Sequence, residues 1–258
     1  MRSTLSLMYH CVYSDDEKST GFQNNSAFIY KISEYAFRKQ VEIISKYLIK
    51  NKINLSYPIF TFDDGGVSFY ENIAPILEKF DQRGLFFIST QYIGSKGFLT
   101  KEQIFDLYSR GHLIGSHSHS HPENMALLSD EEIDQEWKKS IAILSEIIQS
   151  KIEFASIPNG STSKKVVELS KKNGIRYLFT SCPTTKIKDC NGILCLGRFP
   201  VRANMKNEYA LSIVTNGNAR KKLYFRWLVI SLLKGILGKQ YLNVRNVAFR
   251  NKITARNY

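Results

Sequence analysis

Thr61-Phe62-Asp63-Asp64-Gly65-Gly66 is the stretch that decides the fold of this chain, since it ends the apolar run Tyr57-Pro58-Ile59-Phe60 with two adjacent carboxylates and two glycines. Neighbouring side chains on a strand point to opposite faces, and two carboxylates this close repel each other unless a cation or a shared proton relieves them. One interpretation is therefore a metal site at the end of a strand. The other is an Asp-Gly turn in a hairpin, where both residues are favoured for their backbone conformation.

On both sides of this stretch, the spacing of apolar residues alternates between the period of a strand and that of a helix. The predicted strands are residues 5–13, 57–62, 85–89, 112–116, 154–157, 175–180 and 193–196, and the predicted helices begin after Ser33, near Tyr70, and after Thr100, Ser129 and Ser163. Residues 14–32 are expected to form a polar loop. At least six such alternations without a linker predict a parallel β/α architecture in one domain, with the chemistry at the carboxyl ends of the strands.

The composition is that of a globular chain with a strong positive charge. Its 258 residues are 43% hydrophobic, and 36 Lys and Arg against 23 Asp and Glu leave a formal charge of +13. Such a charge attracts nucleic acid, acidic glycans or anionic membranes. No nucleic acid is expected as a partner, because the basic residues near the C-terminus are not interleaved with aromatic side chains on which bases could stack.

Neither the cysteines nor the apolar runs indicate a secreted or membrane-spanning protein. Cys11, Cys182, Cys190 and Cys195 contain no Cys-x-x-Cys pair, so we expect free thiols in a reducing compartment, with a disulfide in the 182–195 region as the alternative. The first residues are expected to form a strand and not a signal peptide, and no window reaches the roughly 18–20 apolar residues of a membrane span. The prediction is a cytoplasmic protein, either soluble or peripheral on a membrane.

A second group of chemically active residues is His117-Ser118-His119-Ser120-His121-Pro122, which holds three of the five histidines. A spacing of four lets a helical turn or a tight loop bring His117 and His121 to one side. With Asp64 they form the three-ligand set of a hydrolytic metal site that keeps one position open for water. The same set serves 2-His-1-carboxylate oxygenases, but the adjacent Asp63 favours hydrolysis. Surface histidines in a polar loop are the alternative, and His119 is left without a role.

Thr61-Phe62-Asp63-Asp64-Gly65 together with His117-Ser118-x-x-His121 resembles the first two motifs of the polysaccharide deacetylases, the carbohydrate esterase family 4-like group built on the NodB homology domain. The resemblance covers roughly residues 5–202. It implies a distorted (β/α) barrel, one divalent metal ion, and hydrolysis of the N-acetyl groups of amino sugars. We therefore divide the chain into a NodB-like deacetylase domain, residues 1–205, and a basic, partly apolar C-terminal helical extension, residues 206–258.

The resemblance also implies a role for each matching residue. Asp63 is the general base, and Asp64, His117 and His121 hold the metal. We expect zinc there, with cobalt, nickel or manganese as alternatives. Such an ion lowers the pKa of water from about 15.7 toward about 7 and so makes it a nucleophile. Pro158 and Asn159 correspond to the turn of the third motif, whose backbone N–H, here that of Asn159, holds the oxyanion.

This sequence departs from the family pattern in three places. Ala155 and Ser156 stand where many members carry an arginine that orients the base, and the fourth motif is not recognisable. No histidine follows His121, so the usual proton donor to the leaving amine is missing, and His10 or a metal-bound water are alternatives. Arg198 is our candidate for the partner that orients Asp63, and we also expect it at the substrate site. Direct pairing of Arg198 with Asp63 requires a distance of about 4 Å between the guanidinium and the carboxylate.

The last fifty residues have a composition of their own. From Tyr209 to Tyr258 there are ten Lys or Arg and no Asp or Glu, and residues 223–238 are apolar almost all round a helix. One interpretation is an interfacial helix on an anionic membrane surface. The alternative is a helix packed on the barrel with a solvated basic end.

The sequence thus predicts a metal-dependent hydrolase that removes N-acetyl groups from the amino sugars of a polysaccharide or of a lipid-linked saccharide. The alternative is a metal-containing glycan-binding protein without turnover. The residues name neither the sugar, its chain length, the metal nor the oligomeric state.

Overall fold

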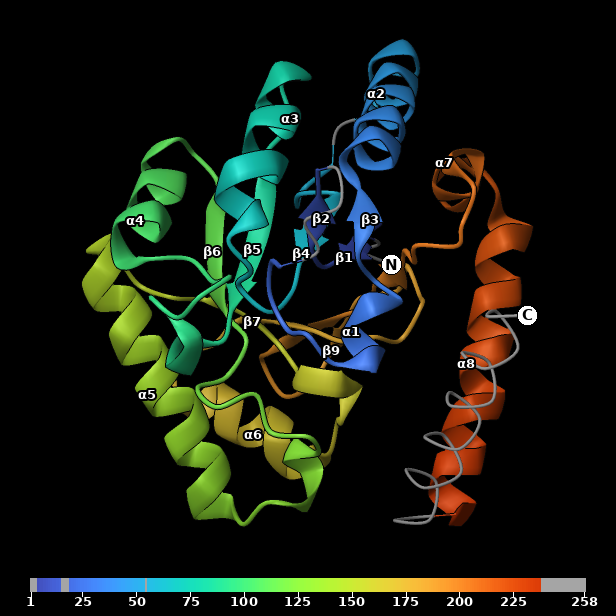
Figure 1. Ribbon diagram of the computed structural model, residues 1–258. Coiled ribbons are helices and arrows are strands. Elements are labelled where there is room, and N and C mark those ends of the chain that lie inside the picture. The colour runs from blue at the N-terminus through green and yellow to red at the C-terminus, as the bar shows by residue number, and fades with distance from the viewer. Residues whose placement is uncertain (1–3, 15–18, 54, 238–258) are drawn as a thin grey trace, which may run out of the picture.

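The computed structural model describes residues 4–14, 19–53 and 55–237. Nine strands form one curled sheet in the order β11-β1-β4-β5-β6-β7-β8-β10-β9, shown in Figure 1. All neighbouring pairs are parallel except β9 with β10. The strands are β1 (Leu7–Tyr9), β4 (Phe60–Phe62), β5 (Gly84–Ile88), β6 (Leu113–Ser116), β7 (Phe154–Ser156), β8 (Tyr177–Phe179), β9 (Lys188–Asp189), β10 (Leu194–Leu196) and β11 (Phe199–Pro200). The predicted distorted barrel is confirmed, as a half-barrel in which the outermost described strands, β11 and β9, do not pair.

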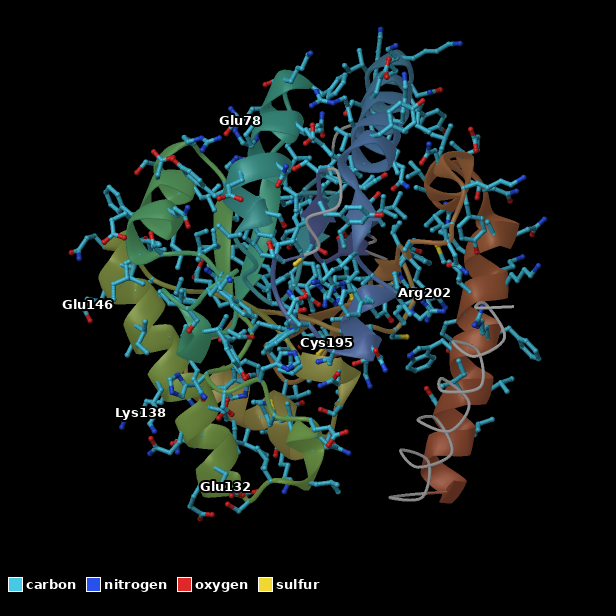
Figure 2. The ribbon with its side chains drawn as sticks, viewed as in Figure 1. Glu78, Glu132, Lys138, Glu146, Cys195 and Arg202 are labelled. Carbon is cyan, nitrogen blue, oxygen red and sulfur yellow. The ribbon has the colours of Figure 1, made fainter. Side chains whose placement is uncertain are left out.

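Helices cover the outer face of the sheet, and α7 and α8 lie together on one side (Figure 1). The helices are α1 (Asn25–Phe28), α2 (Glu34–Lys50), α3 (Ala74–Lys79), α4 (Lys101–Ser109), α5 (Asp130–Ile148), α6 (Lys164–Lys172), α7 (Asn207–Thr215) and α8 (Gly217–Leu237). The predicted caps are present: the hydroxyls of Ser33, Thr100 and Ser129 each accept a backbone N–H of the first helical turn. On α5, Trp137 is buried whereas Glu132, Lys138 and Glu146 point away from the sheet (Figure 2), as the helical period requires.

The register of the parallel strands determines where the site forms. β4, β6 and β7 end at Phe62, Ser116 and Ser156, so the residues that follow them meet at one end of the sheet. β1 lies between β4 and β11, with Leu7 opposite both Phe60 and Phe199. β11, the last strand in the sequence, is therefore separated by β1 alone from β4, which is followed by Asp63 and Asp64.

The structure excludes two of the alternatives that the sequence left open. Both neighbours of β4 are parallel to it, so the Asp-Gly pair is not the turn of a hairpin. All four cysteines are free thiols, so the alternative disulfide between residues 182 and 195 is not formed.

The predicted polar loop over residues 14–32 is wrong in part. It contains α1, which begins at the Asn24 cap, and it leads into β3 (Ile32–Ser33), which pairs with β2 (Val12–Tyr13). The predicted first strand is also divided into β1 and β2. Elements of two to four residues are too short to show a period, so the pattern of apolar residues could not reveal them.

α7, which belongs to the predicted C-terminal extension, packs on the barrel. Ala210, Ile213 and Val214 of α7 belong to the main hydrophobic core, and Gln40 Nε2 of α2 donates to Asn207 Oδ1 at 3.3 Å. The division of the chain at residue 205 thus stays a prediction. Neither α8 nor any other helix in the described part of the chain has the apolar length needed to cross a bilayer. Residues 238–258, which carry the end of the predicted basic extension, lie outside the described residues.

Candidate metal centre and catalytic carboxylate

Asp64, His117 and His121 come together at the carboxyl end of the sheet. Asp64 Oδ1 lies 3.5 Å from His117 Nε2 and 3.4 Å from His121 Nε2, and one ligand atom from each residue lies within 4.8 Å of the other two. Two imidazole nitrogens and a carboxylate oxygen that converge in this way need a cation or a proton between them. This donor set fits zinc and the neighbouring divalent metals.

The backbone at these ligands is unusual. Asp64 has a φ of +89° and His121 a φ of +57°, and Ser118 between the histidines has a φ of +63°. Residues other than glycine rarely adopt this left-handed region, and those that do cluster at functional sites where the surroundings hold them. Gly66, two residues after Asp64, is explained by a steric contact. A Cβ at this position would lie 2.6 Å from the Sγ of Cys11.

The loop that carries the histidines is anchored to α5 by Glu136. The Glu136 carboxylate accepts the backbone N–H groups of His119 and Ser120 at 2.9 and 2.8 Å, and the Ser120 hydroxyl at 2.6 Å. The His119 ring turns away from the ligands, with Nδ1 2.9 Å from the Thr90 hydroxyl. The His119 ring is thus engaged outside the ligand set, and the loop itself is held by Glu136.

Ser156, which the sequence showed only as the place of a missing arginine, connects the two halves of the site. Its backbone oxygen and its hydroxyl lie 3.0 and 2.6 Å from His117 Nδ1, so the proton on Nδ1 is held there and the Nε2 lone pair is left for a metal. The same hydroxyl donates to Asp63 Oδ1 at 3.1 Å. Only the fold reveals this role, because a serine at a strand end carries no distinctive signal.

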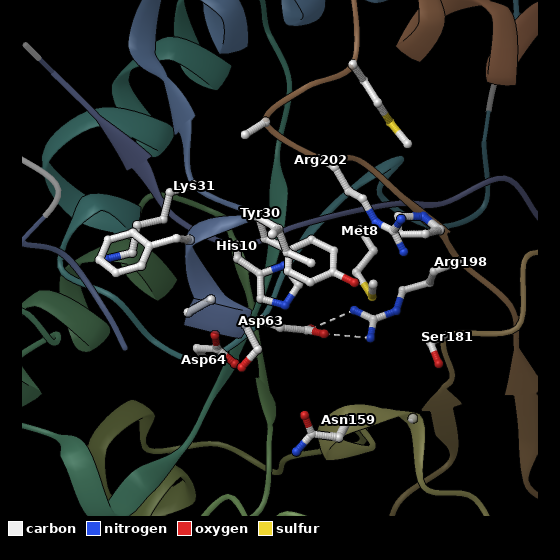
Figure 3. Close-up of a pocket in the computed structure, with 18 of the residues that line it drawn as sticks. Met8, His10, Tyr30, Lys31, Asp63, Asp64, Asn159, Ser181, Arg198 and Arg202 are labelled. Carbon is white, nitrogen blue, oxygen red and sulfur yellow. Dashed lines mark hydrogen bonds and ion pairs between the residues drawn. The ribbon is translucent and has the colours of Figure 1, made fainter. Parts of the chain in front are cut away.

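Asp63 and Arg198 form a buried bidentate ion pair, drawn as dashed lines in Figure 3. Arg198 Nη1 donates to Asp63 Oδ1 at 2.6 Å and Nη2 to Oδ2 at 2.8 Å. The guanidinium also lies over the rings of Phe87 and Phe179. Burial raises the pKa of the Asp63 carboxyl, but the charge of Arg198, the neighbouring His117 and the hydrogen bonds from Arg198 together outweigh burial and hold this pKa below its ordinary value. Asp63 is therefore kept ionised and fixed in orientation.

Arg198→Met is expected to lower the free energy of unfolding by about 3–5 kcal/mol, because it leaves the Asp63 charge buried without its partner. Urea denaturation measures the loss. The control is Arg176→Met, since Arg176 forms an ion pair of the same kind with Glu153 but is 64% exposed, and its loss should cost at most about 1 kcal/mol. Equal effects of the two changes would contradict the importance of the buried pair.

The three candidate metal ligands and Asp63 face one large cleft of about 2400 Å³. On its barrel side the cleft is lined by His10, Tyr30 and Asn159, and its far wall includes Arg226 and Trp227 of α8. The residues of the lining that follow Arg198 in the sequence include four cationic side chains and one carboxylate: Arg202, Lys206, Lys222, Arg226 and Glu208. Figure 2 shows Arg202 between the barrel and α8.

The predicted third motif reaches the cleft through Asn159 rather than through Pro158. Pro158 is buried and does not line the cleft, whereas Asn159 does. Asn159 has a φ of +54°, and no acceptor in the described part of the chain takes its backbone N–H. This N–H is available to a ligand.

His10 lies on the side of the cleft formed by β1, where its ring stacks on that of Tyr30 with centroids 4.4 Å apart (Figure 3). Its Nδ1 is buried and has no hydrogen-bond partner among the described residues. Burial lowers the pKa of His10, whereas the charges of the nearby Asp64 and Asp63 carboxylates act in the opposite direction and favour the protonated ring. The ring centroids of Phe22 and His121 lie 4.9 Å apart. Residues 14–32, which were predicted to form a polar loop, therefore supply Phe22 and Tyr30 to the site.

Comparison with known proteins agrees with this arrangement. Residues 55–178 match the polysaccharide deacetylase family model. The chain is 26% identical over 209 residues to the poly-beta-1,6-N-acetyl-D-glucosamine N-deacetylase of Staphylococcus epidermidis, covering 69% of this chain and 72% of that protein. It is also 26% identical over 147 residues to YxkH of Bacillus subtilis, covering 57% of this chain. That match spans only about half, 52%, of the length of YxkH.

Solved structures show the same fold. The Streptococcus pyogenes deacetylase PplD, solved with acetate, superposes with a TM-score of 0.67 at 21% identity, over 82% of this chain and 97% of that one. IcaB from Ammonifex degensii gives a TM-score of 0.64 at 20% identity, over 83% and 97% of the two chains. Residues 55–178, the segment that matches the family model, contain Asp63, Asp64, His117 and His121. His10 and Arg198 lie outside this segment. Just under half of the chain, residues 55–178, thus resembles the polysaccharide deacetylase family, and the chain shares its fold with these solved deacetylases.

Proposed function

We propose that this chain is a metal-dependent hydrolase of a carbon–nitrogen bond other than a peptide bond, and that it removes N-acetyl groups from the amino sugars of a glycan. The observation that carries the proposal is the pairing of two groups in one cleft: a buried, ionised carboxylate at Asp63 and the ligand set Asp64, His117 and His121. Relatives named as N-deacetylases of poly-beta-1,6-N-acetyl-D-glucosamine support an N-acetylated polysaccharide as the class of substrate.

Asp64, His117 and His121 would hold a divalent ion, zinc in the first place, and such an ion would supply a Lewis acid for the acetamide carbonyl and for water. Asp63 takes the proton from the attacking water, and Arg198 keeps both carboxylate oxygens in position for that transfer. The backbone N–H of Asn159 donates to the oxyanion as it forms. These roles divide the two adjacent aspartates into a base and a ligand.

The proton for the leaving amine is assigned to His10. No histidine follows His121 in the sequence, and the His10 ring faces the cleft in which Asp63 lies. Its stacking on Tyr30 fixes the plane of the ring, and its buried Nδ1 has no competing acceptor in the described part of the chain. A positioned imidazole is the commonest group for such a transfer.

Metal removal tests the proposal. We expect the purified chain to hold about one divalent ion and to release acetate from β-1,6-linked N-acetylglucosamine oligomers or from chito-oligosaccharides. Stripping the ion with a chelator should reduce this release to background, and one equivalent of zinc should restore it. Metal content is measured by mass spectrometry and acetate by an enzyme-coupled assay.

The same experiment separates the enzyme from the alternative glycan-binding protein. A binding protein retains the metal and binds the oligomers but releases no acetate from them. A chain that holds no divalent ion, or whose acetate release survives complete stripping, contradicts the proposed chemistry.

A further inference from the structure

α8 turns an apolar stripe toward solvent. Phe225, Leu228, Val229 and Leu232 recur at the spacing i, i+3, i+4 and i+7, which places them on one face of the helix. This pattern normally faces a core, yet all four side chains are exposed, Phe225 by 67% and Leu232 by 58%. We refer to these four residues as the outer stripe.

The rest of α8 explains why the outer stripe is turned outward. On the opposite side, Trp227 and Ile230 line the cleft, and Leu223 packs against the main core. At its start, Arg220 Nη1 donates to the carbonyls of Ile213 and Val214 at the end of α7, at 2.7 and 3.0 Å. α8 is thus held to the barrel through α7 and the cleft side, and the outer stripe takes no part in that packing.

The charges around the outer stripe identify what would cover it. Lys221, Lys222 and Arg226 flank the stripe and are exposed, and among the described residues no carboxylate lies within ion-pair distance of them. The sequence from Gly217 onward contains no Asp or Glu at all. The Tyr224 ring is 43% exposed, and such an aromatic side chain favours the boundary between headgroups and acyl chains. Apolar, cationic and aromatic groups on one helix suit an anionic lipid surface.

We propose that α8 binds an anionic lipid bilayer, with the outer stripe in the acyl-chain boundary and Lys221, Lys222 and Arg226 on the headgroup phosphates. Each such cation raises the affinity for an anionic surface by about fivefold. Because the cleft opens on the opposite side of the same helix, docking would hold the cleft beside the headgroups. If the proposed deacetylase function holds, a glycan attached to a lipid is the substrate that this geometry presents.

Sedimentation of the full chain with vesicles tests the docking. We expect the chain to bind phosphatidylglycerol vesicles at 0.1 M salt, to bind phosphatidylcholine vesicles much more weakly, and to dissociate as salt rises to 1 M. Phe225→Ser combined with Leu232→Ser should reduce the partition coefficient by at least about tenfold. The matched control is Phe105→Ser, which removes an exposed phenylalanine from α4, on the far side of the barrel from α8 (Figure 1), and should leave binding unchanged.

Three outcomes would overturn the docking proposal. The first is failure of the unaltered chain to bind phosphatidylglycerol vesicles, and the second is equal binding by the variant with Phe225→Ser and Leu232→Ser. The third is a dimer in light scattering that this double substitution dissociates, since the outer stripe would then join two copies of the chain. Acetate release from a soluble oligomer needs no bilayer. Failure of docking therefore leaves the deacetylase proposal untouched, and failure of acetate release leaves the vesicle result to stand alone.

Discussion

Asp63→Asn should lower the rate of acetate release by about 10²–10⁴-fold while the metal content stays at that of the unaltered chain. The amide has nearly the shape of the carboxylate but lacks its basic oxygen, so the proton of the attacking water has no acceptor. The metal ligands Asp64, His117 and His121 are unchanged by the substitution. Steady-state acetate release and metal analysis on the same preparation measure the two quantities.

The matched control is Asp81→Asn, because Asp81 is exposed and precedes β5, at the opposite end of the sheet from the site. Its φ of +54° is tolerated by asparagine as well as by aspartate, so this change should affect neither activity nor metal. Thermal unfolding shows whether the loss in Asp63→Asn comes from chemistry or from instability, since the buried Arg198 then has a neutral amide in place of its counter-charge. Unchanged turnover in Asp63→Asn would remove Asp63 from the role of base.

His117→Ala should abolish metal binding and acetate release together. It removes one of three ligands, whereas changing a mere supporting partner of a ligand already costs about 10–100-fold in metal affinity. It also leaves the hydrogen-bonding groups of Ser156 without the ring that they hold. Metal titration and acetate release are measured in parallel.

The same loop supplies the control for that experiment. His119→Ala removes an imidazole two residues away that contacts Thr90 and is not part of the ligand set, so the variant should keep its metal and most of its turnover. Metal retained in His117→Ala would contradict the role of His117 as a ligand. Metal lost equally in both variants would show that metal binding depends on the loop as a whole and not on the His117 ring.

Much of the site could be predicted from the sequence because the signals are local. Asp63 and Asp64 are adjacent, and His117 and His121 are four apart, so each pair is visible within one short window. The helix caps at Ser33, Thr100 and Ser129 are equally local. The alternation of periods then predicts that the two pairs meet at the carboxyl ends of parallel strands, and the sheet order confirms this.

The remaining features depend on contacts that no local pattern encodes. Ser156 orients His117 through a backbone carbonyl and a hydroxyl, and Glu136 anchors the histidine loop from the side of a helix where any charged residue would be ordinary. Tyr30 and Phe22 reach the site from a segment that looks like a polar loop. Arg198 could be placed beside Asp63 only through the family resemblance, because 135 residues separate them.

The pairing of β11 with β1 also sets the order in which a newly made chain can complete its site. Asp63 and its strand leave the ribosome early, whereas Arg198 follows only after the other strands of the barrel. Until then the Asp63 carboxylate has no counter-charge and is better left in water than buried. The Asp63 carboxylate therefore gains its partner last, when β11 closes against β1, and a chain interrupted before residue 198 carries Asp64, His117 and His121 but leaves Asp63 without its arginine.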